Sequence, residues 1–131
     1  MFKKALIIED DFRIAESYAI LFWSKGIDAV IETSRDEAFL RLTQENFDVC
    51  ILDYQMAGMT AEEFIPKVRL LRSKIHFILI SGNPDIFEIS SKLGVSYALA
   101  KPFSPERLYA YIQRLFEANS SNQPNIQFRG D

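Results

Sequence analysis

Five short apolar runs recur at regular spacing along the chain and constrain its fold more than any other feature. They occupy residues 5–8, 29–31, 49–52, 77–80 and 97–100. Within each run, apolar residues do not alternate with polar ones, as they would in strands with one face in water. Continuous apolar runs of this length are typical of strands buried on both faces of a parallel sheet. The sequence therefore predicts five buried parallel strands.

The segments between these runs have the amphipathic spacing and the end signals of helices. Four polar residues are placed to cap helix starts, and the last two are followed by proline at the first helical position. These predicted caps are Ser34, Thr60, Asn83 and Ser104. Gly26 and Gly94 are placed to end helices. Pro66 would remove a hydrogen bond inside the third helix, so we expect a kink there or a later start.

The predicted first helix is rich in large apolar residues. Its core stripe is expected to contain Phe12, Ala15, Ala19, Phe22 and Trp23. Residues 18–23 are apolar all round the helix, which is more than one sheet-facing stripe requires. These side chains either pack against neighbouring helices or form a docking surface for a kinase or a second copy of the chain, because exposed apolar patches usually mark partners.

Strict alternation of strands and helices predicts an α/β fold with right-handed crossovers and helices on both sheet faces. We expect one doubly wound, five-stranded parallel sheet of order 2-1-3-4-5, flanked by five helices. This domain is predicted to span residues 1–118. Residues 119–131 are polar and are expected to form a disordered tail.

Composition narrows the classes of function. The net charge is −3 and no basic stripe is present, so nucleic acid is not an expected partner. No apolar run approaches the length of a membrane-spanning helix, and the N-terminus does not resemble a signal peptide. The lone cysteine, Cys50, lies in an apolar run and is expected to be a small buried hydrophobe in the reducing cytosol. The protein is therefore expected to be cytoplasmic, with no membrane partner.

Polar residues gather directly after four of the five runs. In open α/β sheets, ligands bind outside the carboxyl ends of the strands, so these positions are candidates for a site. They are Glu9, Asp10 and Asp11 after the first run, Asp53 after the third, Ser81 after the fourth, where the small Gly82 follows it, and Lys101 after the fifth. Asp11 is interpreted as a cap of the first helix. In the expected strand order, the other side chains face one crevice.

Three carboxylates packed together repel one another, and their pKa values rise unless a cation joins them. Mg²⁺ suits a site that offers one or two carboxylates, a backbone carbonyl and waters. With Lys101 and the Ser81 hydroxyl, such a site provides the neutralised charge and the hydrogen-bond donors that a phosphoryl group needs. An aspartate beside them can act as a nucleophile and become an aspartyl phosphate.

These pieces, in this order and spacing, resemble the receiver domain of bacterial two-component response regulators. The resemblance extends from residue 3 to about residue 118. It rests on four segments. Residues 5–11 resemble the first strand and its acidic pair, and residues 47–59 resemble the phospho-acceptor strand and its loop. Residues 78–82 resemble the hydroxyl-bearing strand end, and residues 101–103 resemble the family's lysine with its usual cis proline.

The resemblance implies that Asp53 accepts a phosphoryl group from a sensor histidine kinase or a phosphotransfer protein. It further implies that Asp10, Asp53 and the backbone carbonyl of Gln55 hold Mg²⁺, with Glu9 acting through water. Two residues would contact the phosphoryl oxygens, Lys101 and Ser81. The protein would then be a signalling domain that assists only its own phosphotransfer and dephosphorylation, not an enzyme, and would act on a downstream protein target.

Three positions depart from the family pattern. Ala57 replaces the usual proline of the loop after Asp53, which makes that loop less rigid. The usual Asp-Gly before the third helix is Thr60 with Ala61. Ala98 stands where the family has Tyr or Phe, three residues before the lysine. Tyr97 is adjacent, but neighbouring side chains of a strand point to opposite faces, so it is not expected to substitute.

Three other functions compete with phospho-acceptance as interpretations of this sequence. A receiver fold that acts as an adaptor independently of phosphorylation is favoured by Ala98 but not by the intact acceptor set. A phosphatase of the haloacid-dehalogenase class would need an acid two residues after Asp53, where the chain has Gln55. A flavodoxin-like cofactor binder would need a phosphate loop after the first strand, where the acids would repel phosphate.

Overall fold

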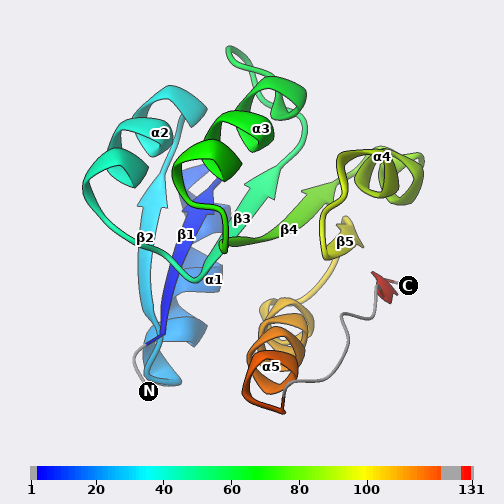
Figure 1. Cartoon of the computed structure of the whole chain (residues 1–131). Coiled ribbons are helices and arrows are strands. Elements are labelled where there is room, and N and C mark those ends of the chain that lie inside the picture. The colour runs from blue at the N-terminus through cyan, green and yellow to red at the C-terminus, as the bar shows by residue number, and fades with distance from the viewer. Residues whose placement is uncertain (1–2, 122–127, 131) are drawn as a thin grey trace.

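The computed structural model describes residues 3–121 and 128–130, and in this part of the chain strands and helices alternate (Figure 1). The elements are β1 (Lys4–Ile8), α1 (Phe12–Ser24), β2 (Asp28–Glu32), α2 (Arg35–Gln44), β3 (Val49–Asp53), α3 (Ala61–Leu71), β4 (His76–Ser81), α4 (Ile86–Leu93), β5 (Tyr97–Ala100), α5 (Pro105–Ser121) and β6 (Phe128–Gly130). Each predicted apolar run therefore forms a strand.

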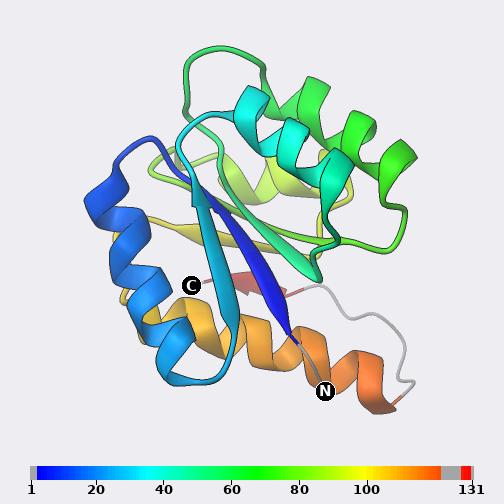
Figure 2. The ribbon, with the colours of Figure 1, turned by 90° about the vertical axis from the view of Figure 1, so that its left-hand side faces the viewer.

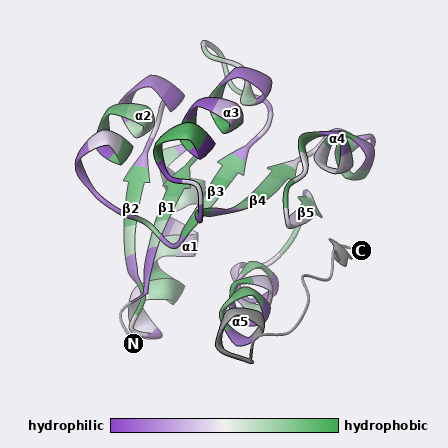
Figure 3. Ribbon diagram, in the orientation of Figure 1, coloured by the Kyte–Doolittle hydropathy of each residue, from purple (hydrophilic) through white to green (hydrophobic). Residues whose placement is uncertain are grey.

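All strand pairs are parallel, and the sheet order is β2-β1-β3-β4-β5-β6. This confirms the predicted order of the first five strands and the five flanking helices. The strands are apolar in their interiors, and Figure 3 shows β1, β3 and β4 largely in the green of hydrophobic residues. Burial of both faces explains this pattern, because neither face of an inner strand meets water.

Two hydrophobic cores lie on the two faces of the sheet. Figure 2 shows α1 and α5 below the sheet and α2 and α3 above it. Successive residues of β1 alternate between the cores, since Ala5 and Ile7 pack with α1 and α5, whereas Leu6 and Ile8 pack with α2 and α3. The lone thiol of Cys50 is fully buried in the second core, as predicted.

Three of the four predicted helix caps are confirmed. The side-chain oxygens of Ser34, Thr60 and Ser104 each accept a backbone N–H from the residue three positions on, at 3.1, 3.2 and 3.2 Å. The fourth prediction is wrong by two residues, because α4 begins after Asp85 and the Asn83 side chain accepts the N–H of Asp85. Pro66 lies inside α3, which begins at Ala61, so the later start of this helix is excluded.

The predicted stripe of α1 is only partly correct. Its buried side chains are Ala15, Tyr18, Ala19 and Phe22. Phe12 and Trp23 are 52% and 50% exposed, because at about 100° per residue they fall at the edge of this face. The Trp23 indole donates to the carbonyl oxygen of Ala29 at 3.0 Å, which lays the ring against β2. Ile20 is also exposed on this helix.

The C-terminal segment contains more regular structure than the predicted tail. Helix α5 continues to Ser121, and residues 128–130 pair with β5 in parallel. Residues 122–127 and 131 lie outside the described residues, so the division of the chain at residue 118 stays a prediction. Among the helices that the structure describes, none is long and apolar enough to cross a membrane.

Candidate functional site

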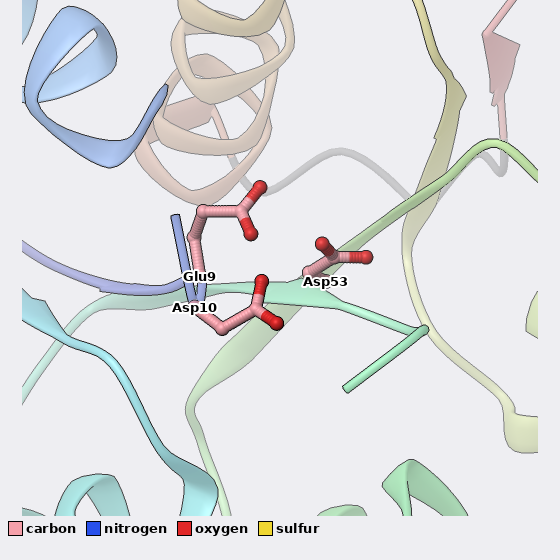
Figure 4. A group of neighbouring side chains, drawn as sticks. All are labelled: Glu9, Asp10 and Asp53. Carbon is pink, nitrogen blue, oxygen red and sulfur yellow. The ribbon is translucent and has the colours of Figure 1, made fainter. Parts of the chain in front are cut away.

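Three carboxylates converge at the carboxyl ends of β1 and β3. Figure 4 shows Glu9, Asp10 and Asp53 gathered at this edge of the sheet. One oxygen from each lies within 4.8 Å of the others. Glu9 and Asp53 are 1% and 3% exposed, whereas Asp10 is open to solvent. Two buried acids beside a third are costly without a cation, so this acidic cluster needs positive charge nearby.

Lys101 supplies part of that charge. Its Nζ donates to Asp53 Oδ2 at 2.9 Å and to Glu9 Oε1 at 3.1 Å. Its backbone N–H donates to the carbonyl of Ser81 at 2.8 Å, which fixes the start of the loop after β5 against β4. The peptide bond to Pro102 is cis, as the resemblance implies. Burial lowers the pKa of Lys101, but the hydrogen bonds to Asp53 and Glu9 outweigh it, and the pKa is raised.

The cluster nevertheless keeps an excess of negative charge. Burial raises the pKa of Glu9 to about 7, and the neighbouring Asp10 and Asp53 act in the same direction, while Lys101 opposes them. Carboxylate oxygens are the ligands that hard divalent cations prefer. The donor set therefore fits a cation such as Mg²⁺, whose charge would offset the repulsion between the acids.

The other predicted site residues lie around this cluster. Gln55 donates its backbone N–H to Asp53 Oδ1 at 3.2 Å, which brings the loop after β3 against the Asp53 carboxylate. Ser81 is fully buried at the end of β4, and its hydroxyl accepts the N–H of Asn83 at 2.9 Å. Asp11 caps α1 as predicted, because its Oδ1 accepts the N–H of Arg13 at 3.0 Å.

Arg35 also reaches this site, and the sequence reasoning missed it. It is the first residue of α2 and is only 1% exposed. Its guanidinium donates to the carbonyl oxygen of Asp53 at 2.6 Å. An arginine next to a helix cap usually extends into solvent. One signal could have revealed it, because a cation at a helix N-terminus is opposed by the helix dipole and needs another partner.

The first two residues of β5 face opposite cores, as predicted. Tyr97 packs in the core of α1 and α5, where its ring centroid lies 5.1 Å from that of Tyr111. Ala98 packs in the other core, opposite Leu79 of β4. The tyrosine ring therefore does not occupy the face on which Ala98 lies.

Fold and site together define a class of signalling domain, and comparison with known families gives the same result. The family described as the response regulator receiver domain matches residues 5–113, which is most of the chain. The protein belongs to this family, the receiver domains of two-component response regulators. An adaptor role that is independent of phosphorylation is not favoured, because the cluster of Glu9, Asp10 and Asp53 is present in full.

Individual relatives agree with this assignment. The transcriptional regulatory protein CrdR of Helicobacter pylori is 29% identical over 96% of this chain and 61% of its own length. The chain thus spans less than two thirds of the length of the curated relatives that it matches first. A CheY-like receiver domain protein from Methanospirillum hungatei has the same fold, with a TM-score of 0.82, 23% identity and coverage of 92% of this chain and 99% of that one. The response regulator TrrA from Thermotoga maritima has a TM-score of 0.77 and 21% identity, with coverage of 87% and 99%.

Proposed function

We propose that Asp53 accepts a phosphoryl group from a phosphohistidine of a sensor histidine kinase or a phosphotransfer protein, in a reaction that requires Mg²⁺. One observation supports this most directly. The buried Asp53 carboxylate lies between two further carboxylates and the Lys101 ammonium, which is 2.9 Å away. This arrangement combines a nucleophile with donors for a cation and a fixed positive charge.

Asp10, Asp53 and the backbone carbonyl of Gln55 would hold the metal ion, and Glu9 would act through a bound water. The mutual approach of the three carboxylates within 4.8 Å supports this assignment, as does the contact of Gln55 with Asp53. The related protein TrrA is described in complex with Mg²⁺ and beryllofluoride. When bound, the ion supplies charge neutralisation and orients the phosphoryl oxygens.

In the transfer step, a carboxylate oxygen of Asp53 attacks phosphorus while the bond from phosphorus to the donor imidazole nitrogen breaks. The imidazole leaves with the bonding electron pair and takes up a proton, and Asp53 becomes an acyl phosphate. The Lys101 ammonium moves from Asp53 Oδ2 onto a phosphoryl oxygen, and the Ser81 hydroxyl donates to another. The domain turns over no external product, so it assists only its own phosphotransfer and dephosphorylation.

A direct experiment tests this function on the protein alone. Incubation with acetyl phosphate and Mg²⁺ should add one phosphoryl group, seen by intact-mass spectrometry and removed by hydroxylamine, which cleaves acyl phosphates. Omission of Mg²⁺ should prevent the modification. A protein that stays unmodified in the presence of Mg²⁺ would contradict the proposal.

Asp10→Asn should weaken Mg²⁺ binding at least about tenfold, because the change removes a charged ligand at the cluster. Amide chemical shifts followed during a Mg²⁺ titration give the dissociation constant. Asp11→Asn is the matched control, since it changes the next carboxylate in the chain and Asn caps helices as well as Asp. Equal Mg²⁺ affinity of the two variants would contradict the ligand assignment.

The response to phosphorylation should be concentrated in residues 81–93, the loop after β4 together with α4. Ser81 would move toward Asp53, and with Ala98 on that face of β5 no ring is available to follow it. Free and beryllofluoride-bound protein can be compared by amide NMR, with light scattering to detect dimers formed through Ile20 and Trp23. A large reorientation of the Tyr97 ring would contradict this expectation.

The downstream target would be a protein that distinguishes the phosphorylated state from the unphosphorylated one.

A further inference from the structure

A buried arginine from a different element holds the loop that follows Asp53. The Nη2 atom of Arg35 donates to the carbonyl oxygens of Asp53 and Tyr54 at 2.6 and 2.7 Å. Its Nη1 atom donates to Met59 at 2.5 Å and approaches the carbonyl oxygen of Met56 at 3.4 Å. One guanidinium group therefore joins the beginning of this loop to its end, where α3 starts.

The pattern of acceptors is selective. The carbonyl groups of residues 53, 54, 56 and 59 accept from Arg35, and residue 55 is not among them. The backbone N–H of Gln55 instead donates to the Asp53 carboxylate. The arginine thus fixes the residues on both sides of Gln55, while the backbone N–H of Gln55 contacts the Asp53 carboxylate.

The loop has little stiffness of its own. Ala57 allows more backbone conformations than a proline would. Gly58 adopts a φ of +88°, a conformation that residues other than glycine rarely adopt. A loop of this composition samples many conformations unless other groups restrain it. The planar guanidinium group can donate to several carbonyl oxygens at once. Arg35 therefore restrains the conformation of a loop whose own backbone is not rigid.

Burial of this charge is costly for the fold. Arg35 is 1% exposed, and within the described residues its Nε has no hydrogen-bond partner. Desolvation lowers the pKa of its guanidinium, and the negative charge of Asp53 opposes this. The position is also unfavourable for the helix dipole. An apolar side chain would avoid these costs, so stability alone does not explain an arginine at this position.

We propose that Arg35 is a positioning residue for the acceptor site, which fixes the loop after Asp53 in the conformation that binds the divalent cation. This inference rests on the proposed function, because the cation site is part of it. The hydrogen bonds of Arg35 go to backbone carbonyls of residues 53–59, so it would act on the site only through that backbone. Its side chain couples the start of α2 to the backbone on which the proposed ligands lie.

The sign of the effect separates positioning from simple electrostatics. A positive charge near the cluster repels Mg²⁺, so removal of that charge alone would tighten Mg²⁺ binding. If Arg35 positions the loop, its removal weakens binding, because ligands that are no longer prearranged must be ordered first. We expect Arg35→Met to raise the Mg²⁺ dissociation constant at least about tenfold, as the loss of groups that orient metal ligands does elsewhere.

The control is Arg69→Met. Arg69 also donates to two backbone carbonyl groups, those of Leu93 at 2.8 Å and Gly94 at 2.6 Å, but at the far end of α4. Urea unfolding checks that both variants are folded before their Mg²⁺ affinities are compared. Only Arg35→Met should weaken Mg²⁺ binding in the amide titration and speed hydrogen exchange of loop residues 54–60, while the exchange of strand amides stays slow.

Unchanged or tighter Mg²⁺ binding by folded Arg35→Met would overturn the inference. If that variant does not fold, Arg35→Lys decides, because it keeps the charge but loses the fork. It should bind Mg²⁺ several-fold more weakly, and wild-type affinity would overturn the inference. Phosphoryl transfer is not needed for either measurement. A wild-type protein that binds Mg²⁺ but resists acetyl phosphate would refute the proposed function and leave this comparison valid.

Discussion

Asp53→Asn should abolish phosphorylation by acetyl phosphate while the protein stays folded. The amide has nearly the shape of the carboxylate, but its oxygen is a far weaker nucleophile and forms no stable acyl phosphate. The change also removes one charge from a crowded cluster, so the fold is not expected to suffer. Intact-mass spectrometry of wild type and variant, with and without Mg²⁺, measures the effect, and urea unfolding checks that the variant is native.

The same experiment tests two alternative acceptors. They are Asp11, which caps α1, and the buried Ser81 hydroxyl at the end of β4. Peptide mapping after hydroxylamine treatment distinguishes them, because a phosphoserine resists this reagent. A phosphoryl group that persists in Asp53→Asn, on either residue, would refute the assignment of the acceptor.

Lys101→Met should slow phosphorylation but tighten Mg²⁺ binding. Phosphorylation should slow by a factor on the order of 10²–10³, as expected when one donor to a developing phosphoryl charge is removed. Mg²⁺ should bind more tightly, because the ammonium group that now contacts Glu9 and Asp53 no longer competes with the cation for these oxygens. Initial rates at saturating Mg²⁺ and amide titrations measure the two effects separately.

Lys92→Met is the control for this prediction. Lys92 pairs with Glu88 on the surface at 3.6 Å, and both side chains are largely exposed. Loss of this pair should leave both the rate and the Mg²⁺ affinity at the wild-type level, since surface pairs contribute little. A Lys101→Met variant that phosphorylates at the wild-type rate would show that the lysine has no role in the transfer.

The features that the sequence predicted well are those set by local pattern. The sheet could be predicted because strands buried on both faces need continuous apolar runs, and Ser34, Thr60 and Ser104 cap helices through bonds to residues three positions away. The acidic cluster could be predicted because the order of parallel strands determines which strand ends meet. These relations need no knowledge of side-chain packing between distant elements.

The features that were missed depend on such packing. Arg35 looks like a solvent-exposed helix residue, and only contact with a loop 18 to 24 positions later in the chain gives it a buried partner. The Asn83 side chain accepts the backbone N–H of Asp85 in the turn before α4. It therefore does not cap the helix, which begins at Ile86. Trp23 lies at the edge of its helix face, and only packing against β2 gives its indole the Ala29 carbonyl group as a partner.

The sheet order has a consequence for the lifetime of an acyl phosphate. The proposed ligands and the acceptor lie at the ends of β1 and β3, which have paired strands on both sides, whereas the edge strand β2 contributes no ligand. Local fluctuations open edges and termini far more often than inner strands. Fraying at β2 would therefore leave the backbone around Asp53 paired. Water would reach the phosphorylated carboxylate through its own crevice, so the hydrolysis rate would be set by the side chains there rather than by opening of the fold.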